Sequence, residues 1–267
     1  MKVRKPDYDF TRTDPAWCKE HPEFAQRTNL GSLSLPYLEP YLNLVMRQAQ
    51  AKLGPEHPLN HDIGLFCKQE ANHYLQHAAF NETTHRAGYE HVGEIEAIFK
   101  THFERLLSEK SLKYNCAYSL GFETLGPVSS IIWFEHNDEL VRHADPKVVA
   151  MWKWHHAEEL EHRTVAYDVY QALYGDYFGR IYGLYAFLRD WKAISRRTLK
   201  YLLAEVRKGM TAAEIAASYG RLGEIEKREL RLAWRGILYG FSPTYSPRKV
   251  RIPRGVDEFV QKLDQAA

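Results

Sequence analysis

Apolar residues recur every three or four positions along most of the chain, a spacing that predicts amphipathic α-helices and not strands. The spacing starts at Ser34, whereas residues 1–33 are polar, carry several prolines and predict an irregular arm. Gly126-Pro127 predicts a kink, because a proline inside a helix removes a hydrogen bond and clashes with the preceding turn. We expect helices over residues 34–53, 60–80, 92–108, 112–143, 146–174, 177–207, 211–220 and 256–265.

Signals for strands are almost absent, so the predicted fold class is all-α. We divide the chain into an N-terminal arm (1–33), a helical bundle (34–208) and a C-terminal extension (209–267) that packs on the bundle. In the extension, Thr211 and Glu214 have the spacing of a capping box and predict the start of a short helix. A proline-rich run follows and is expected to lie along the surface before a last short helix.

Composition and charge exclude several classes of protein. The 267 residues are 45% hydrophobic and 26% charged, which is ordinary for a globular chain with a sizeable core. A formal net charge of +2 provides no strong attraction to nucleic acid. Lysine and arginine become denser after Arg180, which is typical of solvated helix faces; an acidic partner or an anionic membrane surface is the alternative.

Three scattered cysteines indicate neither a disulfide framework nor a cysteine-rich zinc site. The first residues lack a signal-peptide pattern, and no run approaches the ~18 apolar residues of a membrane-spanning helix. We therefore expect a cytoplasmic protein. Contact of residues 177–191 with a lipid surface and assembly into a homodimer stay open.

The pattern Glu-x-x-His, whose two side chains share a helix face, occurs three times, where about one occurrence is expected by chance. Helical spacing separates the three. The pattern that starts at Glu82 lies off the apolar face of its helix and is set aside. The pairs Glu70/His73 and Glu159/His162 lie within apolar faces, where a helix buries its side chains.

Two buried carboxylates on two helices need a common explanation, because burying an ionised carboxylate without a partner costs several kcal/mol. A metal centre provides one, since cations neutralise the carboxylates and neutral imidazoles complete the ligand set. A Glu–His hydrogen-bond network without metal is the alternative, and the repetition of the motif makes it the weaker one.

A dinuclear site in a four-helix bundle needs one further glutamate from each of the two other helices. Glu39 and Glu123 both lie in apolar faces and meet this need. Their separations from the two Glu-x-x-His pairs suit antiparallel helices joined by short loops. The longer gap from Glu70 to Glu123 leaves room for a helical crossover.

This arrangement resembles that of ferritin-like di-iron carboxylate proteins. More narrowly, "LPYLEPYL", "QEANHYLQH" and "WKWHHAEELEHRTVAYDVY" resemble a bacterial family described as predicted metal-dependent hydrolases, over about residues 32–200. The resemblance implies a ferritin-like four-helix bundle with a helical crossover and extra C-terminal helices. It also implies six metal ligands: Glu39, Glu70, His73, Glu123, Glu159 and His162.

Two features depart from that family. Pro40 follows Glu39, and a residue before proline is disfavoured in α geometry, so Glu39 is expected to cap a helix unless the helix continues through the proline. The family tends to carry a Phe-His-Pro element near its C-terminus, whereas the corresponding "SPTYSPRKV" has no histidine.

Residues next to the six ligands extend the hypothesis. Glu158 precedes Glu159, and Gln69 holds the matching place before Glu70; either residue can orient a ligating histidine or face solvent. His77 and His155 fall at the same end of the centre if their helices are antiparallel. They are candidates for extra ligands or for a proton relay, and a core histidine bonded to a backbone carbonyl is the alternative.

His136 and His156 are predicted to be surface residues, and the aromatic residues near the motifs are predicted to belong to the hydrophobic core.

The favoured function is a di-iron enzyme that activates dioxygen and oxidises a small apolar organic substrate. Its cofactors are two Fe ions, with Mn or Zn possible, and an electron-donor protein is a possible partner. A dinuclear metal-dependent hydrolase is the first alternative. A non-catalytic metal-binding bundle is the second.

Overall fold

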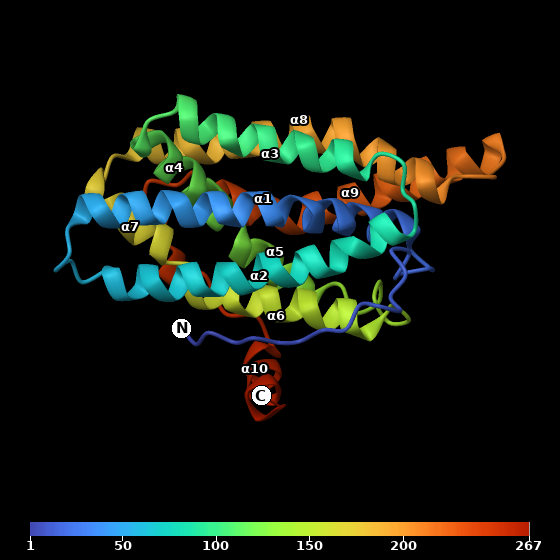
Figure 1. Ribbon diagram of the computed structural model, residues 1–267, viewed down its shortest axis with the longest axis horizontal. Helices are drawn as coiled ribbons and strands as arrows, with labels where there is room; N and C mark the ends of the chain where they lie inside the picture. The colour runs from blue at the N-terminus through green and yellow to red at the C-terminus, as the bar shows by residue number, and fades with distance from the viewer. Residues whose placement is uncertain (267) are drawn as a thin grey trace.

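A computed structural model describes residues 1–266, and all regular structure within them is helical, which confirms the predicted all-α class (Figure 1). The elements are α1 (Pro22–Leu53), α2 (Asn60–Arg86), α3 (Val92–Glu109), α4 (Leu112–Glu123), α5 (Gly126–Glu135), α6 (Pro146–His162), α7 (Val165–Leu173), α8 (Tyr177–Val206), α9 (Ala212–Gly240), the 3-10 helix η1 (Pro247–Lys249) and α10 (Val256–Ala266).

Helix α1 begins earlier than the apolar spacing predicted. The irregular arm expected over residues 1–33 ends before Pro22, and the predicted helix start at Ser34 lies inside α1. Asn29 and Ser32 are fully buried in this first part of α1 and are hydrogen-bonded to side chains from outside the helix. Polar residues therefore occupy core positions here, and their partners cannot be recognised from periodicity.

Helix α1 also continues through Pro36 and Pro40, so the expectation that Glu39 caps a helix is wrong. Each proline removes one backbone hydrogen bond, which disfavours this geometry locally. The cost is outweighed because α1 packs along α2 and α3 over its length and buries apolar residues on both sides of the prolines. Glu39 consequently projects from the middle of a long helix.

Two long predicted helices are each broken once. The helix predicted over 112–143 ends as α4 at Glu123 and resumes next to the predicted kink as α5, which ends at Glu135 and does not reach the predicted residue 143. The helix predicted over 146–174 is divided at Arg163 into α6 and α7. The backbone angles at the breaks remain right-handed helical, with φ −91° and ψ −22° at Leu125 and φ −49° and ψ −17° at Arg163. The apolar spacing therefore runs across both breaks and hides them from sequence analysis.

The short helix predicted over 211–220 is the beginning of α9, which extends to Gly240. The predicted capping box is confirmed: the Thr211 N–H donates to Glu214 Oε2 at 2.7 Å, and the Glu214 N–H donates to Thr211 Oγ1 at 3.3 Å. The rest of α9 was missed because charged residues dominate it and because few of its apolar residues are buried, Leu222 being one of those few.

Helices α1, α2, α3 and α8 run along the long axis of the molecule (Figure 1). Helix α1 packs on α2 and α3, α4 packs on α8, and α5 packs on α6. Helix α3 connects α2 to α4 and lies against α1 and α8, which is the position expected of a crossover helix. The assignment to the ferritin-like class stays a prediction.

None of the helices among residues 1–266 combines the length and the apolar character that crossing a membrane requires.

Candidate metal centre

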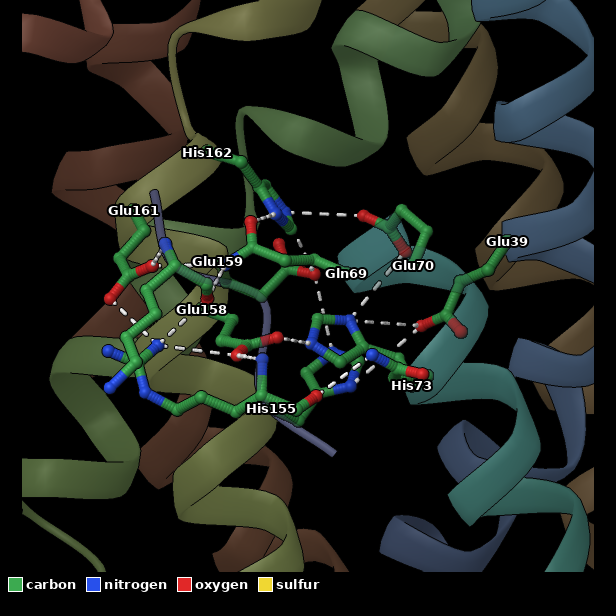
Figure 2. A network of polar contacts seen from close by, with 12 residues as sticks. Glu39, Gln69, Glu70, His73, His155, Glu158, Glu159, Glu161 and His162 are labelled. Carbon is green, nitrogen blue, oxygen red and sulfur yellow. Dashed lines mark hydrogen bonds and ion pairs between the residues drawn. The ribbon is translucent and has the colours of Figure 1, made fainter. Parts of the chain in front are cut away.

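The residues that the sequence singled out gather in the interior between α1, α2, α4 and α6 (Figure 2). All six expected ligands are at most 1% exposed: Glu39, Glu70, His73, Glu123, Glu159 and His162. The motif that was set aside lies elsewhere, since Glu82 is exposed and His85 pairs with Glu96 at the surface. Helical periodicity thus separated the two buried motifs from the exposed one.

The carboxylates at this point have no hydrogen-bond donors. Within the described residues, both oxygens of Glu39, Glu70, Glu123 and Glu159 are buried and unpartnered. Buried polar atoms are normally hydrogen-bonded, and buried carboxylates are normally paired or coordinate metal. Eight such oxygens in one place fit a site built for cations.

Donor atoms from different helices approach one another in two groups. In each group, one atom from each of three residues lies within 4.8 Å of the others. Glu123 adjoins the second group, with its Oε2 3.6 Å from Nε2 of His162. The groups are Glu39–His73–His155 and Glu70–Glu159–His162.

Gln69 fixes the orientation of His162. Its amide Nε2 donates to the backbone carbonyl of Lys2 at 3.0 Å and to Glu161 Oε2 at 3.0 Å, so its Oε1 faces His162. His162 Nδ1 lies 3.1 Å from that oxygen and must donate its proton to it. In the neutral imidazole, Nε2 then carries the lone pair, and it lies 3.2 Å from Glu70 Oε1.

Glu158 fixes the orientation of His73 in the same way. His73 Nε2 lies 3.1 Å from Glu158 Oε2 and donates to it. Glu158 is held in turn by the backbone N–H of Arg4 at 3.2 Å and by its guanidinium at 3.3 Å. His73 Nδ1 is left facing Glu70 at 3.7 Å and Glu39 at 4.0 Å.

The two supports are reciprocal across the helix pair. Gln69 precedes Glu70 on α2 and holds the histidine of α6, whereas Glu158 precedes Glu159 on α6 and holds His73 of α2. Each helix therefore contributes a Glu and a His to the centre and a support for the other helix's His. The orienting role that the sequence left open for both residues agrees with this geometry.

A chain of hydrogen bonds that runs through His77 orients a third imidazole, that of His155. Asn81 donates to the backbone carbonyl of Ser32 at 3.0 Å and accepts from Ser32 Oγ at 2.6 Å, so that hydroxyl accepts from His77 Nδ1 at 2.9 Å. Burial lowers the pKa of His77 and of His155, which keeps both neutral. His77 Nε2 then accepts from His155 Nδ1 at 3.2 Å, and the lone pair of His155 Nε2 faces Glu159 Oε1 at 3.3 Å.

Burial and charge repulsion shift the pKa values of the buried carboxyl groups. Burial and the proximity of Glu70 raise the pKa of Glu39 well above its usual value, and burial with Glu159 does the same to Glu123. Burial also acts to raise the pKa of Glu159, but the adjacent imidazole of His162 outweighs it and holds that pKa well below the usual value. The site therefore contains more negative charge than its histidines neutralise.

Without metal, protons can bind to the imidazole nitrogens of His73 and His162 that would otherwise coordinate cations. Burial acts to lower the pKa of His73, but the hydrogen bond to Glu158 and the nearby charge of Glu70 outweigh it and raise that pKa well above the usual value. Glu159 likewise outweighs burial and raises the pKa of His162. Binding of metal at these nitrogens is therefore expected to release protons.

Replacing Glu158 by glutamine should weaken metal binding about 10- to 100-fold, the usual contribution of a group that hydrogen-bonds a ligating histidine. The amide can still accept from His73 but carries no charge, so the change isolates the electrostatic part of the support. Competition with a chromophoric chelator measures the affinity. Glu82→Gln is the control, because Glu82 belongs to the exposed copy of the motif. Equal affinities for the two variants would contradict the role given to Glu158.

Two residues of the site were not recognised from sequence. His156 was predicted to be a surface residue, and that prediction is wrong: it is 5% exposed and packs against the rings of Trp133 and Trp152. A signal was available, because His156 follows the buried Trp152 by one helical turn. His136, by contrast, is exposed as predicted.

Arg4 is the second residue that was missed. It belongs to the irregular segment, yet it is 8% exposed and contacts Glu158, Glu161 and Asp264 of α10. No periodic signal marks it, because its neighbours adopt no regular structure.

A cavity of about 190 Å³ lies beside the centre. His155, His156 and Glu159 form its polar side. The remaining wall is largely apolar and aromatic, and includes Leu35, Phe122, Leu125, Trp152, Phe187 and Trp191. A small organic molecule in this cavity would therefore contact both apolar surface and the metal-facing side chains.

Comparison with known proteins gives one match. A family model described as predicted metal-dependent hydrolase matches residues 2–250. No curated protein and no solved structure gives a significant match to the chain.

Proposed function

The chain belongs to the predicted metal-dependent hydrolase family, and on this premise we propose that it is a hydrolase with two metal ions bound between α1, α2, α4 and α6. One observation carries the proposal: eight carboxylate oxygens are buried together without a hydrogen-bond donor among the described residues. Three oriented imidazole lone pairs face the same space. Only cations, or protons in their absence, satisfy such a set of acceptors.

Each group of donors would hold one ion. His73 and Glu39 would bind the first, together with His155, whose Nε2 also faces Glu159 of the second group. Glu70, Glu159 and His162 would bind the second, with Glu123 next to them. His155 is thereby added as a ligand to the six residues that the resemblance implied. Carboxylate and imidazole donors suit iron, manganese and zinc alike, and the two Fe ions expected from the sequence are one of these choices.

When bound, two such ions would supply Lewis-acid activation of water and of a scissile carbonyl or phosphoryl group. The chain itself binds and orients the substrate. The apolar cavity wall offers a surface for an apolar part of the substrate next to Glu159, and the neutral His156, whose two ring nitrogens have no partner among the described residues, can hydrogen-bond a polar substrate group. His77 holds the Nδ1 proton of His155 and keeps Nε2 directed at the centre.

The apolar wall also supports a second candidate, a di-iron oxidase or oxygenase acting on a small apolar substrate. Hydrolysis needs water at the centre, whereas oxidation of an apolar substrate benefits from a dry cavity next to an oxygen-rich ligand set. This reading adds dioxygen as co-substrate and an electron-donor protein as partner.

Metal-dependent turnover distinguishes the candidates. The chelated protein is loaded in turn with Zn(II), Mn(II) and anaerobic Fe(II), and is then assayed with short-chain aryl esters and for oxygen uptake. We expect two ions per chain and ester hydrolysis that a chelator abolishes. Rapid repeated oxygen uptake with Fe(II) and no hydrolysis would replace the hydrolase by the oxidase. Binding without either activity would leave a metal-binding bundle.

A further inference from the structure

A basic groove lies away from the metal centre, between α8 and α9 and against the start of α1. Its cavity of about 450 Å³ is lined by five cationic side chains, by one carboxylate, that of Glu226, which pairs with Arg27, and by apolar residues of α8 and α9. The cations are Arg27, Lys192, Arg196, Lys200 and Arg207. The chain as a whole has a net charge of only +2, so this concentration of positive charge is local.

Most of this charge has no protein partner. Arg27 pairs with two carboxylates of α9. Lys192, Arg196 and Lys200 form no ion pair with any residue in the 1–266 range. They are one helical turn apart along α8, so they present three charges in a row to the groove.

Two buried polar atoms in the groove also lack partners. Nη2 of Arg207 and Oγ of Ser195 are both inaccessible to solvent and have no hydrogen-bond partner among the described residues. The other side of the Arg207 guanidinium is fixed, since Nε donates to Ser218 and the group stacks on Tyr219. A held guanidinium with a free N–H is a typical feature of an anion site.

The groove shares lining residues with a second cavity, which in turn shares lining residues with the cavity beside the metal centre. A cavity of about 380 Å³ shares Arg27, Trp191 and Ser195 with the groove. It shares Ser129, Trp152 and Trp191 with the cavity of about 190 Å³ that contains Glu159. Trp191 lines all three, and the middle cavity is walled mainly by apolar and aromatic residues.

From this placement we propose that the protein binds an anionic amphiphile, with its carboxylate or phosphate in the groove of Arg196 and Arg207 and its apolar chain directed past Trp191 to the metal centre. A basic groove alone would fit any small anion. The apolar cavities in series, which begin at the groove and end at Glu159, add the requirement for a long apolar segment.

The order of the cavities determines which part of the substrate reacts. The bond that is cleaved lies at the end of the apolar chain remote from the acid, because that end reaches Glu159 and His155. For a hydrolase, the expected substrate is an ester at the far end of a long-chain acid, which water converts to an alcohol and a carboxylic acid. This step rests on the proposed function, whereas binding of the amphiphile does not.

Calorimetry on the metal-free protein tests binding separately from catalysis. The probes are dodecanoate, dodecyl phosphate, dodecanol and inorganic phosphate, all below micelle-forming concentrations. We expect both anionic dodecyl compounds to bind more tightly than dodecanol or phosphate alone. In a series from hexyl to hexadecyl phosphate, affinity should rise roughly three- to fourfold per methylene until the cavities are filled. Equal affinity for inorganic phosphate and dodecyl phosphate would overturn the proposal.

Adjacent arginines of α8 provide a matched pair of variants. Arg196 lines the groove, whereas the exposed Arg197 does not, and neither forms an ion pair among the described residues. Arg196→Gln should weaken binding of dodecyl phosphate roughly tenfold, the loss of one charge-assisted contact, and Arg197→Gln should leave it unchanged. Similar losses in both variants would indicate nonspecific attraction and contradict a site in the groove.

A variant in the apolar passage tests the direction of the chain. Ser129 lines both the middle and the inner cavity, and Ser129→Phe would fill space at the boundary that they share. We expect it to weaken binding of dodecyl phosphate but not of hexyl phosphate. Circular dichroism monitors folding of the variant. Unchanged chain-length dependence would contradict the placement of the apolar chain.

With metal bound, ω-acetoxydodecanoate and dodecyl acetate are compared as substrates. The inference expects faster hydrolysis of the first, which carries an acid at the end opposite the ester. If the anionic amphiphiles bind but neither ester is hydrolysed, the proposed hydrolase function fails and the binding site stands. If both esters are cleaved equally and no amphiphile binds, the hydrolase stands and this inference fails.

Discussion

Replacing Glu123 by glutamine should stabilise the metal-free protein and, in the same variant, weaken metal binding by more than about 100-fold, since even groups that only support a ligand contribute 10- to 100-fold. The stabilisation follows from charge repulsion. Glu123 is 1% exposed, and burial together with Glu159, Glu70 and Glu39 raises its pKa well above the usual value. A neutral amide of the same shape removes an unfavourable buried charge, which is worth on the order of 2 kcal/mol.

The pH dependence of this difference has a defined sign. A carboxyl whose pKa is raised in the folded protein contributes full stability below its unfolded pKa of about 4.5 and loses that contribution as the pH rises. Glutamine does not ionise. The unfolding free energies of the metal-free wild type and of Glu123→Gln should therefore be similar near pH 4, and the variant should become progressively more stable than the wild type above it.

Urea denaturation of the chelated proteins at several pH values measures the stability, and competition with a chromophoric chelator measures metal affinity. Glu139→Gln is the control, because Glu139 is exposed and forms no ion pair in the described part of the chain. A metal-free variant that is less stable than wild type at neutral pH would show that Glu123 is held by the protein itself. Unchanged metal affinity would remove Glu123 from the centre.

Gly126→Ala should lower activity about 100-fold with little change in folding stability. A Cβ atom on Gly126 would collide with the carboxylate of Glu159, whereas no backbone atom blocks it. The end of a flexible side chain can move aside, so the protein should fold, but the displaced carboxylate would no longer meet His162. A misplacement of about 1 Å at a reacting centre is enough for a loss of this size.

Gly64→Ala is the matched control for this prediction. Gly64 also lies in a helix, and a Cβ atom there would meet nothing within 4 Å. Alanine should stabilise that helix by about 0.5–1 kcal/mol and leave activity unchanged. Steady-state kinetics and thermal unfolding of both variants separate the two effects. Full activity of Gly126→Ala would mean that Glu159 is not used in the conformation seen here.

The two buried Glu-x-x-His motifs were predictable because a ligand pair on a helix has a local signature. Glu70 and His73 lie one turn apart, within an apolar face whose spacing marks the core. The exposed motif at Glu82 was distinguishable by the same spacing. Glu158 and Gln69 could be anticipated only as neighbours of ligands, since nothing local indicates which histidine each would contact.

Other parts of the site leave a weak local trace or none. Arg4 reaches Glu158 from an irregular segment, and His156 was assigned to the surface although it packs against two tryptophan rings. The breaks after Glu123 and His162 keep helical backbone angles, so periodicity continues across them. For Arg4 the deciding contact joins residues that are far apart in the chain.

The sequence by itself determined the all-α class, most helix positions and the residue types gathered at the centre, because helical spacing and side-chain chemistry are local properties. Only the tertiary structure decided that His155 directs a lone pair at Glu159, that Glu158 and Gln69 support each other's helix, and that a basic groove adjoins cavities leading inward. Those features depend on the rotation and packing of whole helices, which are set by the sum of many distant contacts.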